Sequence, residues 1–142
     1  MKIKLASTAA EVDKCFEVMV QLRPDLSRQQ FAEQVKRQQK TGYKLAFVEV
    51  EGQVVCVAGF RFSENLSWGK FMYIDDLVTD AGQRSKGYGD ALLDWLINFA
   101  ETENCRELHL DSGVQRHDAH RFYLRKRLDI IAHHFAIKLK SR

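Results

Sequence analysis

Apolar residues recur at helical spacing in two stretches of the first forty positions. Thr8 and Glu11 have the spacing of a capping box, and the pattern that follows them predicts one helix that ends before Pro24. Ser27 and Gln30 repeat that spacing and predict a second helix. The residues expected on the buried faces are Val12, Cys15, Phe16, Met19 and Val20 in the first helix, and Phe31 and Val35 in the second.

Shorter runs with strand character surround these helices. Lys2–Ala6 alternates polar and apolar residues, which predicts a short first strand. Tyr43–Val50 and Gln53–Phe62 are rich in β-forming residues, and Glu51-Gly52 between them is a two-residue hairpin signal. Lys70–Val78 is a further run of the same kind. An antiparallel meander is therefore expected after the helices.

The period changes again in the second half of the chain. A helix is predicted from Gly87, with Tyr88, Ala91, Leu92, Trp95, Leu96 and Phe99 on one face. Arg106–Leu110 indicates a buried strand, Asp118–Lys126 a short helix, and Ile130–Leu139 one or two final strands. The order β-α-α-β-β-β-α-β-α-β predicts a mixed α/β (α+β) fold: a central, largely antiparallel sheet of six to seven strands flanked by about four helices, in a single domain over residues 1–142.

Composition narrows the class of protein. With 45% hydrophobic and 29% charged residues, the chain is typical of folded globular proteins. No apolar run approaches the roughly 18 residues that span a bilayer, and no apolar signal core is visible near Met1, so a cytoplasmic protein is expected. Cys15, Cys56 and Cys105 are widely separated, and neither they nor the late histidines have the spacing of a metal site. No metal is expected.

Charge is distributed unevenly around a net value of +3. Residues 116–142 contain eight Lys or Arg residues against Asp118 and Asp129. Such a patch could contact nucleic acid, the phosphates of a nucleotide cofactor, or only water. Nucleic acid is the disfavoured alternative.

The residues Gln83–Gly89 form a basic, glycine-containing turn that enters a helix. Unpaired N–H groups and the helix dipole favour an anion there, and glycine allows close backbone approach. The segment is not a P-loop, because Tyr88 and Gly89 stand where Lys and Ser/Thr are needed. It is not a Rossmann fingerprint either, because the third small residue would fall at Leu92.

Arg84, Gly87 and Gly89 match the pattern [RQ]-x-x-G-x-[GA], which resembles the acyl-CoA pyrophosphate motif of GNAT acetyltransferases. Tyr73–Val78 resembles the central strand of that family, and Ala119–Lys126 resembles its late "FYxK" helix. Together with the order of elements, the resemblance covers nearly the whole chain.

One departure from the family pattern is visible after that helix. "FYxKxGF" would place Gly at Arg127 and Phe at Leu128. The glycine that favours a left-handed helix end is therefore missing.

The resemblance implies acetyl-CoA as co-substrate. It implies that the pyrophosphate is held by Arg84, Ser85, Lys86, Gly87, Tyr88, Gly89 and Asp90, and that the pantetheine arm pairs as an added strand with the backbone of Leu77 and Val78. It also implies Tyr123 as general acid for the departing thiolate.

An acceptor amine must lose a proton, and two adjacent carboxylates are candidates to receive it. Asp75 and Asp76 point to opposite faces of a regular strand, so at most one faces the substrate, as base or through a water. Asp76 is preferred, although both carboxylates could instead only pair with Arg or Lys. Asp111, at the end of the next strand, could orient the substrate or simply cap a turn.

The resulting hypothesis is an N-acetyltransferase that acts by direct attack of a primary amine of an unidentified small molecule or peptide. A non-catalytic acyl-CoA-binding module and a nucleic-acid binder are the alternatives. Arg23, Arg28 and Arg61 could recognise an acidic acceptor or could be solvated. No membrane partner is expected, and the last strand could form the edge of a homodimer.

Overall fold

The computed structural model describes residues 1–141, which divide into two compact units. The first unit runs from Met1 to Leu110, and the second begins at Asp111. In the described residues, no helix is both long enough and apolar enough to cross a membrane.

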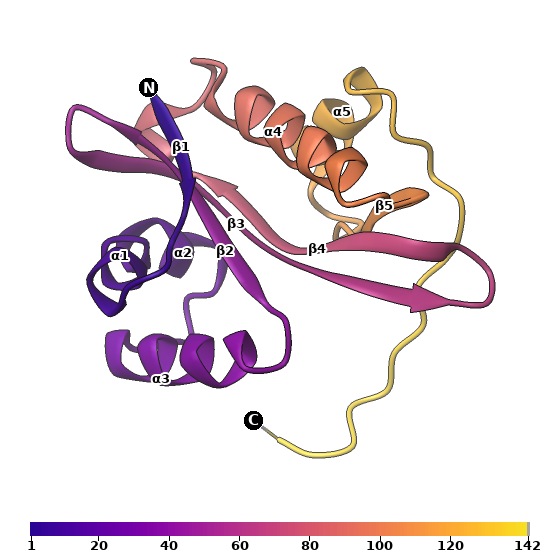
Figure 1. The fold of residues 1–142 in the computed structure, drawn as a ribbon, viewed down its shortest axis with the longest axis horizontal. Coiled ribbons are helices and arrows are strands. Elements are labelled where there is room, and N and C mark those ends of the chain that lie inside the picture. Colours follow the sequence, from indigo (N-terminus) through magenta and orange to yellow (C-terminus); the bar gives the residue numbers. More distant parts are fainter. Residues whose placement is uncertain (142) are drawn as a thin grey trace. The chain divides into compact units, whose positions relative to one another are not determined.

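A single five-stranded sheet forms the centre of the first unit (Figure 1). Its strands lie in chain order and are β1 (Lys2–Leu5), β2 (Lys44–Val50), β3 (Gln53–Asn65), β4 (Gly69–Thr79) and β5 (Glu107–Leu110). The first four pair antiparallel, and β5 pairs parallel to β4. Glu51 and Gly52 both have positive φ, 51° and 78°, which is the backbone of a type I′ hairpin turn. The predicted meander is confirmed.

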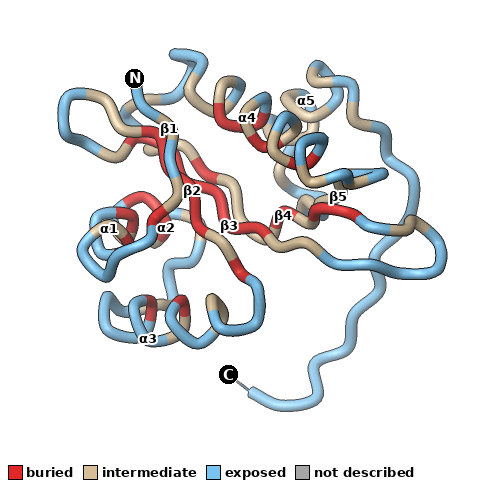
Figure 2. The backbone as a smooth tube through the Cα atoms, in the orientation of Figure 1, coloured by how far each residue is buried: buried red, intermediate tan, exposed pale blue. Residues whose placement is uncertain are grey.

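Helices cover both faces of this sheet. The helices of the first unit are α1 (Ala9–Lys14), α2 (Phe16–Leu22), α3 (Arg28–Gln39), the 3-10 helix η1 (Ala81–Gln83) and α4 (Tyr88–Thr102), and the second unit contains α5 (His117–Arg125). Figure 1 shows α1, α2 and α3 on one face and α4 on the other. The first three pack over Leu45, Phe47 and Val57, while Phe99 of α4 packs against Phe60 with 5.8 Å between ring centroids. Burial is accordingly concentrated in the middle strands and on the inner side of α4 (Figure 2).

The first predicted helix is divided in two at Cys15. In a regular helix the Cys15 N–H would donate to the carbonyl of Glu11. Here the Cys15 thiol donates to that oxygen at 3.4 Å, and the N–H donates to the Val12 carbonyl at 3.0 Å instead. The turn tightens, α1 ends at Lys14, and α2 starts again at Phe16. The described residues therefore contain five α-helices, where about four were expected.

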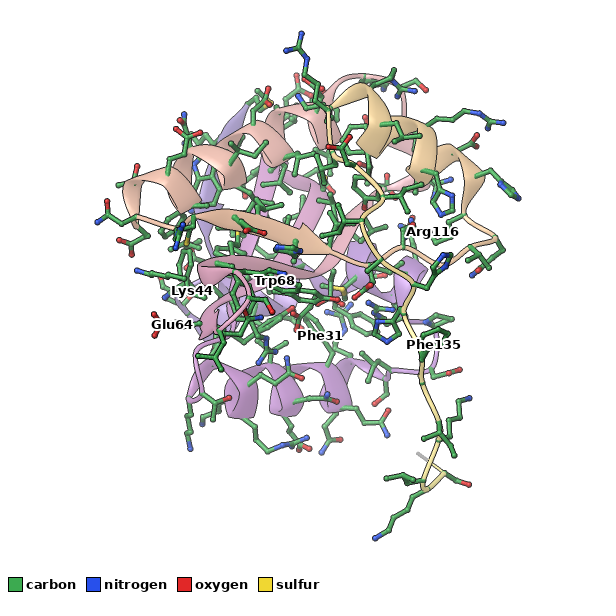
Figure 3. The ribbon with its side chains drawn as sticks, turned by 90° about the vertical axis from the view of Figure 1, so that its right-hand side faces the viewer. Phe31, Lys44, Glu64, Trp68, Arg116 and Phe135 are labelled. Carbon is green, nitrogen blue, oxygen red and sulfur yellow. The ribbon has the colours of Figure 1, made fainter. Side chains whose placement is uncertain are left out.

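The prediction of final strands in Ile130–Leu139 is wrong within the described residues. Residues 128–139 are not assigned to a strand, and the five strands of the sheet all lie in the first unit, instead of six to seven. Phe135 and Ile137 are 91% and 82% exposed, and Figure 3 labels Phe135 on this extended segment. Apolar alternation alone does not make a strand, because a ladder also needs a hydrogen-bonded neighbour.

The end of α5 forms without the glycine of the family pattern. Arg127 has φ 68°. Its N–H donates to the Leu124 carbonyl, and the Leu128 N–H donates to the Tyr123 carbonyl, both at 3.0 Å. These two bonds are those of a Schellman motif. Arg127 therefore occupies the left-handed position that glycine favours.

Candidate functional site

The turn before α4 has the backbone of an anion-binding cradle. Ser85 and Gly87 have positive φ, 65° and 87°, and are separated by one residue. Alternation of this kind turns successive N–H groups toward one side. Gly87 is the N-cap of α4 and makes no side-chain cap hydrogen bond. A Cβ at Gly87 would meet no atom of the chain within 4 Å, so the space beside it is open.

The first turn of α4 supplies further donors to the cradle. The Ala91 N–H donates to the Gly87 carbonyl at 3.0 Å. By helix geometry, no carbonyl within the helix lies four positions before residues 88–90 to accept from their N–H groups. The helix dipole also makes this end of α4 positive. Exposed Arg84 and Lys86 add positive charge beside it. The arrangement suits a phosphate or pyrophosphate.

The chain that leads into the cradle is anchored to two elements. The Asp80 N–H donates to the Val55 carbonyl of β3 at 2.8 Å. The side-chain amide of Gln21, in α2, donates to Asp80 Oδ1 at 2.7 Å and accepts from the Ala81 N–H at 2.9 Å. The start of the cradle is thus fixed relative to the sheet and to α2.

One edge of β4 is open directly before the cradle. Within the first unit, β5 pairs with β4 only from Phe71 to Ile74, whereas β3 pairs with β4 as far as Thr79. The backbone of β4 from Asp75 onward therefore lacks a β5 partner. An extended ligand can add to such an edge through main-chain hydrogen bonds.

The direction of individual backbone groups follows from the ladder. Alternate residues of an antiparallel strand direct their N–H and C=O groups to opposite sides. The Asp80 N–H faces β3, so the groups of Val78 face β3 as well. Leu77 and Thr79 face the open side. The open edge therefore presents the backbone groups of Leu77 and Thr79, whereas those of Val78 are used in the ladder with β3.

The paired end of β4 is held to β5 by aromatic packing. Trp68, in the turn before β4, stacks on His109 of β5 with 3.5 Å between ring centroids, and Phe71 meets the Trp68 ring edge-on at 4.9 Å. His109 Nε2 lies 2.7 Å from Glu107 Oε1. β4 and β5 are thus fastened where they pair, and β5 ends at Leu110 while β4 continues to Thr79.

A β-bulge places both adjacent carboxylates in one cluster. Gly59 pairs with Asp76 and Phe60 with Ile74, so Asp75 is an extra residue in β4. The bulge disrupts strict alternation, and the expectation that Asp75 and Asp76 point to opposite faces of a regular strand is wrong for this reason. Asp75 pairs with Arg61, whose guanidinium lies 5.4 Å from the ring centre of Tyr43.

Tyr43 in turn contacts the second carboxylate. Its hydroxyl donates to Asp76 Oδ2 at 2.8 Å. Burial raises the pKa of Tyr43 well above its ordinary value, and the Asp76 charge raises that pKa further, so the phenol stays protonated and donates. A Cβ at Gly59 would lie 1.7 Å from the Tyr43 hydroxyl and 2.5 Å from Asp76 Oδ2. The contact therefore requires glycine at position 59.

Arg23, the C-cap residue of α2, binds the same carboxylate from the other side. Its Nε donates to Asp76 Oδ1 at 3.0 Å, and its Nη2 lies 2.9 Å from that oxygen. Nη2 also donates to the Asp75 carbonyl at 2.9 Å. Both oxygens of each carboxylate thus accept hydrogen bonds, from Arg23 and Tyr43 at Asp76 and from Arg61 at Asp75.

Comparison with known proteins gives the family. The model of the acetyltransferase (GNAT) family matches residues 7–128. The chain belongs to this family. It is also 32% identical over 125 residues to the uncharacterized N-acetyltransferase YhdJ of Bacillus subtilis (strain 168), a match that covers 87% of this chain and 88% of that protein. The expected family and the acetyltransferase class are confirmed.

Solved structures show the same GNAT fold at low identity. The ribosomal-protein-alanine N-acetyltransferase of Brucella melitensis biovar Abortus 2308 matches with a TM-score of 0.83 and 18% identity, over 98% of this chain and 100% of that one. The glucosamine-6-phosphate N-acetyltransferase of Arabidopsis thaliana matches with a TM-score of 0.77 and 18% identity, over 99% and 100%. At such identities the likeness shows the fold alone.

Two of the predicted GNAT site residues lie in the second unit. Tyr123 is half-buried on α5, and its ring lies 5.4 Å from that of Phe122. Asp111 is exposed at the start of the unit, and its carboxylate lies 3.3 Å from His134 Nδ1. Within residues 1–141, no group of three or more His, Cys, Asp and Glu side chains is placed to hold a metal ion.

The three arginines considered for an acidic acceptor are all paired within the GNAT domain. Arg23 binds Asp76 and Arg61 binds Asp75. Arg28 contacts Asp13 at 2.8 Å and also Glu17. The roles of Tyr43 and Gly59 were not predicted, although a glycine inside a strand is a signal for a bulge or for close approach of another group.

Proposed function

We propose that this protein transfers the acetyl group of acetyl-CoA to a primary amine of a small molecule or peptide by direct attack. The observation that carries the proposal is the succession, along one stretch of chain, of an open strand edge and an uncapped helix N-terminus. The first suits an amide-containing pantetheine arm, and the second suits a pyrophosphate. Acyl-CoA contains both groups in one molecule.

In this proposal, the backbone of residues 84–90 holds the pyrophosphate. The αL residues Ser85 and Gly87 aim amides at the anion, while Arg84 and Lys86 supply charge. Leu77 and Thr79 present the backbone groups to the pantetheine arm. The thioester then lies near the bulge of β4, where the carboxylate cluster is found.

The acceptor must reach the thioester as a free amine. Alkylammonium groups have a pKa near 10.4, so a proton has to be removed near neutral pH. We assign this step to the Asp75–Asp76 pair, acting directly or through a water. The amine nitrogen then forms a bond to the thioester carbonyl carbon, and the carbon–sulfur bond breaks.

Tyr123 is proposed as the donor to the departing thiolate, from its place in the family helix. With reference pKa values of roughly 10 for Tyr and 8.5 for a thiol, complete transfer is uphill by about 2 kcal/mol, so hydrogen bonding carries part of the effect. Tyr123→Phe is expected to lower kcat by about 10²-fold and leave acetyl-CoA affinity unchanged. Steady-state kinetics with an unchanged kcat would contradict this role.

The cofactor site is tested by calorimetric titration with acetyl-CoA. The test variant is Gly89→Glu, which adds bulk and negative charge to the first turn of α4. The matched control is Asn98→Glu, which adds the same carboxylate at an exposed position later on the same helix. Binding by the wild type and the control, with binding lost in Gly89→Glu, is the expected result.

Other outcomes separate the competing functions. Failure of the wild type to bind acetyl-CoA would contradict the proposal. Binding without amine-dependent release of the CoA thiol, across a panel of small-molecule and peptide amines, would favour a non-catalytic acyl-CoA-binding module. Polynucleotide binding that weakens steeply with salt would favour the basic C-terminal residues as a nucleic-acid surface.

A further inference from the structure

The bulge of β4 exposes a backbone group at the entrance to the open edge. The N–H of Asp76 faces β3, because Asp76 is in register with Gly59 where the regular ladder resumes. The peptide bond between Asp75 and Asp76 is trans, so the Asp75 carbonyl points opposite to that N–H, toward the open side. It is the first carbonyl on this edge after β5 pairing ends at Ile74.

Arg23 satisfies that carbonyl and is itself held in place. Nη2 of Arg23 donates to the Asp75 carbonyl at 2.9 Å, while Nε donates to Asp76 Oδ1 at 3.0 Å. The planar guanidinium fork can make both contacts at once, which a lysine ammonium does less well. The opposite oxygen of Asp76 receives the Tyr43 hydroxyl at 2.8 Å. Asp76 is thus fixed between α2 and the residue that precedes β2.

We propose that Arg23 is a positioning residue. Held by Asp76, which also accepts from Tyr43, it binds the Asp75 carbonyl, the first carbonyl of β4 beyond the pairing with β5, so that pantetheine pairs with β4 only from Leu77 onward. This inference rests on the proposed acetyl-CoA function. Arg23 thereby sets the register of the pantetheine arm along β4, and with it the position of the thioester relative to the strand. This arrangement also distinguishes the two carboxylates, because Asp76 is held by Arg23 and Tyr43 together and Asp75 by Arg61.

Two features of the fold support a positioning role. Gly59 faces Asp76 across the ladder, and any larger residue there would collide with the Tyr43 hydroxyl. The Asp76 side chain is 13% exposed and that of Asp75 is 25% exposed, so Asp76 is the more enclosed of the pair. A charge-assisted hydrogen bond is stronger in such a sheltered place than in open water.

The test compares two ligands that share the pyrophosphate but differ in the arm. Acetyl-CoA contains pantetheine, and adenosine 3′-phosphate 5′-diphosphate does not. Arg23→Gln is expected to weaken acetyl-CoA binding by about tenfold, because the charged hydrogen bonds of the guanidinium are lost. The affinity for the nucleotide fragment is expected to stay within about twofold of the wild-type value. Arg23→Lys should fall between wild type and Arg23→Gln, since it keeps the charge without the fork.

Arg28→Gln is the matched control. Arg28 lies in the same three-helix layer and also pairs with two carboxylates, Asp13 and Glu17, neither of which belongs to β4. The Arg28→Gln protein is expected to bind both ligands with wild-type affinity. If Arg23→Gln does not fold, as judged by circular dichroism, Tyr43→Phe removes only one hydroxyl from the same network and is expected to show the same selective loss.

The remaining outcomes are decisive. Equal loss of both ligands, or no loss of acetyl-CoA, in a folded Arg23→Gln or Tyr43→Phe protein would overturn the positioning role and leave the proposed function standing. Failure of the wild type to bind either ligand would overturn the proposed function, and the positioning role with it.

Discussion

The N-termini of α1 and α3 differ from that of α4 in whether a side chain caps their backbone N–H groups. In α1 the Thr8 hydroxyl accepts from the Glu11 N–H at 3.1 Å, and the Glu11 carboxylate accepts from the Thr8 N–H at 3.1 Å. In α3, Ser27 and Gln30 make the same reciprocal pair, at 3.0 and 3.1 Å. Gly87 at α4 has no side chain with which to do this. Two helix ends are thus capped by their own side chains, and the third is not.

The charges at the N-termini of α1 and α4 differ in the same way. The backbone N–H of Ser7 and the ammonium of Lys4 are the main causes that lower the pKa of Glu11 to about 2, so the α1 terminus already has its negative charge. α5 also lacks a side-chain cap, but its N-cap Arg116 has φ −89°. What sets α4 apart is therefore the pair of left-handed residues, Ser85 and Gly87, that precedes it.

Replacement of Gly87 is expected to give the largest effect. Gly87→Ala must hold an L-residue at φ 87°, which costs roughly 1–2 kcal/mol, and it puts a methyl group where the anion would lie. Acetyl-CoA affinity should fall at least about tenfold by calorimetry. Gly42→Ala is the control, because Gly42 has φ 103° and equally open surroundings but lies beyond α3. Equal affinity in the two variants would contradict the comparison.

Removal of the two caps is expected to act on stability alone. Thr8→Ala and Ser27→Ala each lose a side-chain acceptor for a helix amide, and each should lower the free energy of unfolding by about 1 kcal/mol. Urea unfolding followed by circular dichroism measures this change, and calorimetry should show unaltered acetyl-CoA binding. A cap variant that lost cofactor affinity while still folded would show that the helix ends are not independent.

The parts of the fold that local signals determine could be predicted from the sequence. Both capping boxes, the Glu51-Gly52 turn and the Gly87 helix start depend on residues within four positions of one another, and the structure confirms them. At the break, the Cys15 thiol donates to the Glu11 carbonyl and the Cys15 N–H donates to the Val12 carbonyl. Periodicity does not show such a change of hydrogen-bond partners.

The chemistry around Asp76 could not be predicted because it depends on distant residues. Arg23 and Tyr43 are 53 and 33 positions away in the chain, and the bulge at Asp75 exists only relative to the register of β3. The motif residues of the cradle are contiguous, so pattern matching finds them. Residues that meet across a sheet are found only once the strand pairing is known.

The smallest expected effect concerns another helix end, that of α5. Arg127 adopts φ 68° to complete the Schellman bonds. Arg127→Gly relieves roughly 1–2 kcal/mol of strain, less about 0.4–1 kcal/mol of added freedom in the unfolded chain, so a net gain of about 0.5 kcal/mol is expected. Arg127→Ala removes the same charge but keeps the Cβ, and should show no gain. Hydrogen exchange of the Leu128 amide, which donates to Tyr123, measures the effect locally. Equal protection in the Gly and Ala variants would mean that Arg127 is not strained and that glycine in the family pattern serves another purpose.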